Sequence, residues 1–146
     1  DGTTDFIFGP STALFENCEI RSKTNSYVTA ASTPEDIAVG YVFKNCKLTA
    51  NPGVDKVYLG RPWRPYAATV FINCEMGKHI RPEGWHNWGK EENEKTARYA
   101  EYNSTGEGAA AAGRVKWAKQ LTKKEAAQYD DLNYIYRMCS DWKPEN

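Results

Sequence analysis

The stretch Val42-Phe43-Lys44-Asn45-Cys46-Lys47-Leu48 recurs in varied form twice more in the chain. Its counterparts are Leu14-Phe15-Glu16-Asn17-Cys18-Glu19-Ile20 and Val70-Phe71-Ile72-Asn73-Cys74-Glu75-Met76. The cysteines of successive copies are 28 residues apart in both cases, from 18 to 46 and from 46 to 74. A period of about 20 to 50 residues is typical of chains in which each repeat is one structural unit stacked on the next.

The pattern inside the repeated phrase predicts a β-strand. Apolar residues occupy its first, second, fifth and seventh positions, and Val, Ile and Phe suit a pleated, half-buried surface. A strand that returns once per repeat predicts an all-β fold, a parallel β-helix whose coils rise about 4.8 Å each. We expect a single domain over residues 1–146, with coils over about 1–105 and a C-terminal tail over about 106–146.

The cysteines of the phrase are expected to pack rather than to bridge. Cys18, Cys46 and Cys74 occupy one register beside apolar residues, and a buried free cysteine behaves as a small hydrophobe. Disulfides remain the alternative, as four cysteines could form two of them. Zinc is disfavoured because no two cysteines lie two to four residues apart. Cys139 lies outside this register and indicates nothing alone.

The asparagines of the phrase, Asn17, Asn45 and Asn73, are expected to line up at a bend between strands. Asparagine tolerates left-handed backbone conformations and can hydrogen-bond to its neighbours along a stack. We therefore interpret these three residues as structural.

Composition limits the classes of partner. Lys and Arg together number 19, as do Asp and Glu, so the formal charge is zero and no basic stripe predicts nucleic-acid binding. No segment approaches 18 consecutive apolar residues, so we expect no membrane span. The chain begins with Asp1, and a strand-like segment follows almost at once. We expect residues, including N-terminal coils, to precede it, and an uncovered first coil would permit self-association.

The C-terminal part predicts three further features. Residues 98–103 alternate like one more strand. The pattern Thr122-Lys123-Lys124-Glu125 is that of a capping box and predicts a short helix through Tyr129. The last segment, with Tyr134, Tyr136 and Trp142, is aromatic enough to fold back over an edge of the core.

Two charged residues are candidates for chemistry on the outer face of the coils. Asp5 and Arg61 each lie 13 residues before a cysteine of the register, Cys18 and Cys74. A constant coil length would give them one angular position two coils apart, about 10 Å along the axis. A carboxylate beside a guanidinium stays ionised and could act as a nucleophile or base. A plain structural salt bridge is the alternative.

Aromatic residues surround both members of this pair. Phe8 follows Asp5, and Trp63 follows Arg61 in a loop made rigid by Pro62 and Pro65. Exposed aromatic faces beside a charged pair can stack on sugar rings, although such residues are often part of a core. The two histidines, at 79 and 86, lack a serine or carboxylate partner at a suggestive spacing, so we expect them to be structural.

The stretches Asp5-Phe6-Ile7-Phe8-Gly9 and Leu59-Gly60-Arg61-Pro62-Trp63 resemble two signature motifs of the pectin methylesterases, which are built on a right-handed parallel β-helix. Residues 27–32, 82–85 with Trp88, 99–102 and 114–117 are also similar to that family. The resemblance thus covers nearly the whole chain, in order.

The resemblance implies hydrolysis of galacturonic acid methyl esters in pectin, with release of methanol. Asp5 would be the nucleophile, passing through an acyl-enzyme, and Arg61 would hold its carboxylate ionised and oriented. Trp63 would pack against the sugar and Phe8 would line a neighbouring subsite. No cofactor or metal is implied, the substrate is methylated homogalacturonan, and the protein is expected to be secreted or periplasmic.

Part of the family's active site lies outside this sequence. The family also uses an acid/base Asp and an oxyanion-stabilising Gln, in a strand one coil before the nucleophile. This leaves open whether the isolated chain is active, since one lost oxyanion donor costs on the order of 100- to 1000-fold in rate.

Two alternatives remain. One is another pectin-degrading β-helix enzyme, a pectate lyase with clustered carboxylates on calcium or a polygalacturonase with several close Asp residues. Against it, Asp36, Asp55 and the pair Asp130-Asp131 stand apart in sequence. The other is a non-catalytic carbohydrate-binding module or a degenerate esterase.

Overall fold

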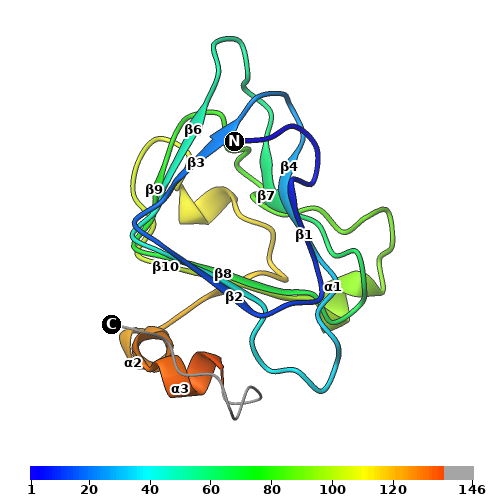
Figure 1. Cartoon of the computed structure of the whole chain (residues 1–146). Coiled ribbons are helices and arrows are strands. Elements are labelled where there is room, and N and C mark those ends of the chain that lie inside the picture. Colours follow the sequence, from blue (N-terminus) through cyan, green and yellow to red (C-terminus); the bar gives the residue numbers. More distant parts are fainter. Residues whose placement is uncertain (137–146) are drawn as a thin grey trace.

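The computed structural model describes residues 1–136, which form a parallel β-helix of about three turns (Figure 1). All ladders between its strands are parallel and build three sheets. The first contains β1 (Ile7–Gly9), β4 (Tyr27–Ala31) and β7 (Tyr58–Gly60). The second contains β2 (Ala13–Glu16), β5 (Tyr41–Lys44), β8 (Ala68–Ile72), β10 (Arg98–Tyr102) and β11 (Lys119–Gln120). The third contains β3 (Glu19–Ser22), β6 (Lys47–Ala50) and β9 (Glu75–Met76).

The 28-residue period holds on two of the three sheets. In the second sheet Leu14 pairs with Val42 and Val42 with Val70, and the third sheet keeps the same offset. In the first sheet, Ile7 pairs with Thr29, 22 residues on, and Thr29 pairs with Gly60, 31 residues on. The difference comes from loop length, because the loop after β1 has three residues (10–12) and the loop after β4 has nine (32–40). A constant coil length is therefore wrong on this side.

Side chains of the repeated phrase stack inside the helix. The Phe15 and Phe43 rings are 4.7 Å apart, and the Phe43 and Phe71 rings 4.4 Å apart, both nearly parallel. The three cysteines of the register are unbridged, which confirms the packing prediction. The Cys46 thiol donates to the Phe15 carbonyl in the coil before it, at 3.3 Å. Cys139 lies outside the described residues.

The asparagines of the phrase take the predicted left-handed conformation, with φ of 55° for Asn17 and Asn45 and 53° for Asn73. Asn103, with φ of 52°, extends this ladder by one member. Its Nδ2 donates to the Asn73 Oδ1 at 2.9 Å, so an amide hydrogen bond joins these two members of the ladder.

The predicted C-terminal strand and capped helix are both present, and the helix ends two residues earlier than predicted. The strand expected at 98–103 is β10, and α2 (Lys123–Ala127) begins at the Thr122 capping box, in which both bonds with Glu125 are present. β11 pairs with β10 beyond the point, near residue 105, where the coils were predicted to end. The remaining short helices are α1 (Asn93–Thr96), η1 (Ala111–Gly113), η2 (Gln128–Asp130) and α3 (Leu132–Ile135).

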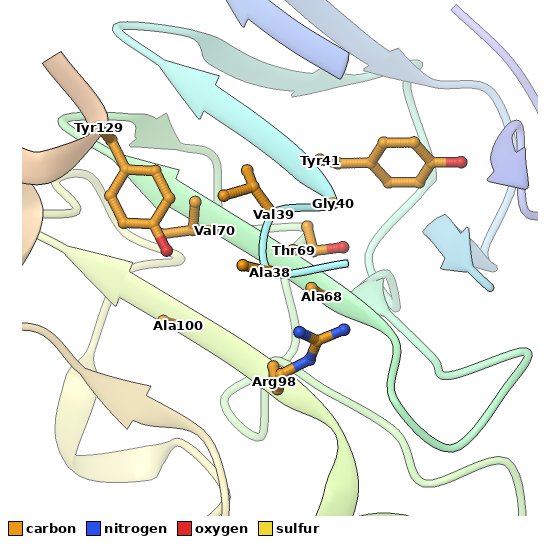
Figure 2. Close-up of a pocket in the computed structure, with 10 residues that line it drawn as sticks. All are labelled: Ala38, Val39, Gly40, Tyr41, Ala68, Thr69, Val70, Arg98, Ala100 and Tyr129. Carbon is orange, nitrogen blue, oxygen red and sulfur yellow. The ribbon is translucent and has the colours of Figure 1, made fainter. Parts of the chain in front are cut away.

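The tail packs on the outer face of the second sheet, not over an end of the core (Figure 1). Ile135 is buried against Val42, Val70 and Ala100 of that sheet. A cavity of about 40 Å³ lies in this region, between Tyr129 of the tail and residues of β5, the loop before it, β8 and β10. Figure 2 draws the residues that line it. Trp142, which was expected to take part, lies outside the described residues. No helix within residues 1–136 is long and apolar enough to cross a membrane.

Candidate active site

Asp5 occupies a strained position directly before β1. Its φ is +48°, in the left-handed region that only a few residue types other than glycine adopt. Its backbone N–H donates to the Tyr27 carbonyl at 3.0 Å, which fixes it to the next coil. The carboxylate remains 18% exposed, so it is accessible from the outer face of the solenoid.

Arg61 follows β7 and contacts Asp5 with two parallel hydrogen bonds. Its Nε donates to Oδ1 at 3.1 Å and its Nη2 to Oδ2 at 2.7 Å. Such a bidentate pair stabilises the charge of the carboxylate and fixes its orientation. The structure therefore brings together the two residues that the sequence singled out.

The reasoning from a shared angular position was nevertheless wrong in detail. Asp5 is level with Tyr27, and Tyr27 pairs with Tyr58, so Arg61 lies three residues beyond the position of Asp5. The long Arg61 side chain makes up the difference.

Two aromatic rings contact the Arg61 guanidinium, and no signal in the sequence gives either ring this role. Its Cζ lies 3.9 Å from the centre of the Tyr27 ring and 3.9 Å from that of the Trp88 ring. Burial lowers the pKa of Arg61, but the hydrogen bond and charge of Asp5 outweigh this, and the pKa is raised overall. Arg61 is thus a fixed cation.

Trp88 has an unusual backbone, with φ of +63°. Its N–H donates to the His86 Nδ1 at 3.0 Å, and the Gly89 N–H donates to the Asn87 Oδ1 at 2.8 Å. The run His86-Asn87-Trp88-Gly89 carried a turn signal in the sequence. Nothing in that signal shows that the loop returns to Arg61.

His86 lies at this site, whereas His79 lies elsewhere. The His86 ring contacts the Tyr27 and Tyr58 rings edge-on, at 5.7 and 5.2 Å between centres. Burial, together with the charges of Arg61 and Arg81, lowers the pKa of His86. His79 is buried near residues of β6 and β9, and burial lowers its pKa too.

Phe8 and Trp63 form an exposed aromatic pair beside the ion pair. Phe8 is 65% exposed and Trp63 40%, which makes them the exposed large hydrophobic residues of the described chain. Their ring centres are 6.0 Å apart in an edge-on arrangement, although the two residues come from different coils. An aromatic pair left in solvent near the Asp5–Arg61 ion pair indicates a binding surface.

The family model for pectinesterases matches residues 1–138. The chain belongs to the pectinesterase family. Pectinesterase 31 of Arabidopsis thaliana is 42% identical over 136 residues, which are 92% of this chain and 43% of that protein. The chain therefore spans less than half the length of this pectinesterase.

Solved pectin methylesterase structures share the fold. One, from carrot, has a TM-score of 0.85 and 30% identity, over 99% of this chain and 51% of that one. Another, in complex with a hexasaccharide, has a TM-score of 0.77 and 30% identity, over 98% of this chain and 49% of that one.

The structure of this pectinesterase chain brings together no group of three or more His, Cys, Asp or Glu side chains suited to a metal ion, as far as residue 136. Asp5 is paired with an arginine instead of a second carboxylate. The charged groups of the candidate site are thus one nucleophile candidate and one fixed cation.

Proposed function

We propose that the whole protein hydrolyses methyl esters of galacturonic acid units in pectin and releases methanol. The observation that carries this proposal is the bidentate Asp5–Arg61 pair, held on the outer face of the solenoid beside Phe8 and Trp63. Membership of the pectinesterase family supports it. The two similar pectin methylesterase structures support it as well, and this chain covers about half the length of each.

In the proposed reaction Asp5 is the nucleophile. One carboxylate oxygen attacks the ester carbonyl carbon, the bond to the methoxy oxygen breaks, and methanol leaves with a proton from a general acid. The mixed anhydride that remains is then hydrolysed by water, which frees the Asp5 carboxylate and a galacturonate. The acid/base Asp and the oxyanion Gln implied by the resemblance are not among residues 1–146.

The other residues bind and orient. Arg61 presents its N–H edge to both oxygens of the Asp5 carboxylate and so fixes the orientation of that group. Trp63 packs against a sugar ring, and Phe8 lines a neighbouring subsite. Both rings are exposed, and their centres lie 6.0 Å apart, so together they offer one apolar surface to the sugar. The steps use side chains and water only.

The proposed partner is methylated homogalacturonan, in keeping with the hexasaccharide bound to one of the similar structures. Such a substrate lies outside the cytoplasm, so the proposed location is secreted or periplasmic.

Methanol release from methylated pectin by the whole protein tests this function. We expect Asp5→Asn to lower the rate by at least about 1000-fold, because the amide is a poor nucleophile. Asp36→Asn, in an exposed loop, serves as the matched control and should retain the wild-type rate. Equal rates for the wild type and Asp5→Asn would defeat the assignment of Asp5.

The alternatives give different products. A lyase would form unsaturated sugars and a polygalacturonase new reducing ends, without methanol. A non-catalytic module would bind pectin and form none of these products.

A further inference from the structure

Two aromatic rings contact the Arg61 guanidinium in addition to Asp5. The Tyr27 and Trp88 ring centres each lie 3.9 Å from its Cζ, and both rings limit how far the flat guanidinium can tilt. Its N–H edge stays uncovered and meets the Asp5 carboxylate. We call Tyr27, Trp88 and His86 the Arg61 clamp.

Tyr27 connects both members of the ion pair. Its ring stacks on Arg61, while its backbone carbonyl accepts the Asp5 N–H at 3.0 Å. The Tyr27 ring is itself held by Tyr58, at 5.2 Å between centres and 9° between planes. Replacing the Tyr27 side chain should therefore alter the position of Arg61 and leave the backbone pairing of β4 intact.

The Trp88 side of the clamp depends on a strained backbone. A bulky residue with positive φ, such as Trp88, costs free energy unless its surroundings stabilise it. The bond from the Trp88 N–H to the His86 Nδ1 is the direct stabilising contact. It requires an unprotonated Nδ1, because a protonated imidazole has no acceptor.

We propose that Tyr27 and His86 are positioning residues that hold Arg61 against Asp5, Tyr27 by packing its ring against the guanidinium and His86 by fixing the Trp88 ring against it. This proposal rests on the proposed function for its kinetic consequences. Neither residue contacts the reacting atoms in this account. Each acts through the orientation of Arg61.

The charges around His86 make its side of the clamp sensitive to pH. Arg61 and Arg81 both disfavour the imidazolium. The Tyr27 and Tyr58 rings face the imidazole, and Glu83 and Glu94 line the same surface groove. Protonation would remove the acceptor for Trp88 and add a third cation, so the clamp should loosen as the pH falls below the usual histidine range.

The Tyr27 side is tested by kinetics on the whole protein. We expect Tyr27→Leu to lower kcat about tenfold with KM changed less than about twofold, because orientation is lost and binding groups remain. Tyr27→Phe keeps the ring and loses only the hydroxyl, which makes a minor contribution to the raised pKa of Arg61, so this variant should recover most of kcat. Equal loss in Tyr27→Leu and Tyr27→Phe, or a change confined to KM, would overturn the proposal.

The His86 side has a conservative partner in asparagine, whose Oδ1 can accept the N–H two residues on. We expect His86→Leu to lower kcat about tenfold and His86→Asn to retain most of it. At low pH, kcat of His86→Asn should also fall less than kcat of the wild type, because residue 86 can no longer be protonated. The same fall in kcat at low pH in both proteins, or equal kcat values for His86→Leu and His86→Asn, would contradict the role of His86.

A measurement without turnover separates this proposal from the proposed function. The Arg61 Nε–H resonance, assigned by its loss in Arg61→Lys, should be shifted by the ring currents and exchange slowly with water. Both properties should weaken in Tyr27→Leu and His86→Leu while Tm stays within a few degrees. An unaffected resonance would overturn the clamp. Absence of methanol release by the wild type would overturn only the proposed function.

Discussion

At the scale of single residues, the site combines strain with restraint. Asp5 and Trp88 both have positive φ, and each is tied down by a hydrogen bond from its own N–H. Strained backbone at such positions is typical of functional sites, where the surrounding structure over-determines the geometry. The restraint falls on the groups around the Asp5 carboxylate, and the Asp5 side chain itself stays partly exposed to a substrate.

The exposed aromatic pair gives a prediction about binding. We expect Trp63→Ala to raise KM for methylated pectin about tenfold and to change kcat less than about threefold, because the ring contacts sugar and not the reacting atoms. Initial rates over a range of substrate concentrations check this. A fall in kcat with unchanged KM would contradict a binding role for Trp63.

The structural roles of the cysteines and asparagines in the repeat could be predicted from the sequence because their environment repeats from coil to coil. The Cys46 and Cys74 thiols donate to equivalent Phe carbonyls in the coil before each, and the three asparagines share one backbone conformation, so one periodic pattern predicts these positions. Trp88 meets Arg61 only because the loop after residue 82 returns to the first sheet, and Tyr27 meets it because β4 pairs with β7 in that sheet. No periodic signal encodes such a contact, which is why the clamp was missed.

At the scale of elements, the asparagine ladder contributes to the bend between the second and third sheets. Asn73 combines a left-handed backbone with a hydrogen bond accepted from Asn103. We expect Asn73→Ala to lower the free energy of unfolding by about 2 kcal/mol, since alanine loses the bond and disfavours this conformation.

Asn73→Gly is the matched comparison, because glycine loses the hydrogen bond but accepts the positive φ. It should cost about 1 kcal/mol less than Asn73→Ala. Denaturant unfolding measures both. A glycine variant as unstable as the alanine variant would show that the backbone conformation is not the main contribution.

The first sheet shows where sequence reasoning reached its limit at this scale. The repeated phrase fixes the second and third sheets, whereas β1, β4 and β7 are joined to them by loops of unequal length. Loops on a surface tolerate insertions, so the offset on this side changes from coil to coil. The candidate site lies on this sheet. The sequence therefore predicted that Asp5 and Arg61 lie close together, but not the register of the strands that carry them.

At the scale of the whole molecule, one buried ion pair ties the last coil together. Glu101 in β10 and Arg114 after η1 have side chains only 2% and 3% exposed, and two hydrogen bonds of 2.7 and 3.1 Å join them. Arg114 also donates to the carbonyls of Pro82 and Gly108. It thereby connects three segments of the C-terminal coil.

Loss of the Glu101 charge should therefore destabilise the fold. We expect Glu101→Gln to lower the free energy of unfolding by about 3–5 kcal/mol, because it leaves Arg114 buried without a counter-charge. Glu19→Gln removes an exposed partner of Arg21 and should leave the unfolding midpoint almost unchanged. Equal midpoints for the wild type and Glu101→Gln would contradict the importance of this pair.

The central claim is that an ester carbon of the substrate meets Asp5 beside Arg61 on the outside of the solenoid. The most direct test is a crystal structure of the whole protein, as its Asp5→Asn variant, with a methylated galacturonate oligosaccharide. The account predicts an ester carbonyl carbon about 3–3.5 Å from a side-chain atom of residue 5, with a sugar ring against Trp63. An oligosaccharide bound elsewhere, with residue 5 out of reach of every ester, would contradict it.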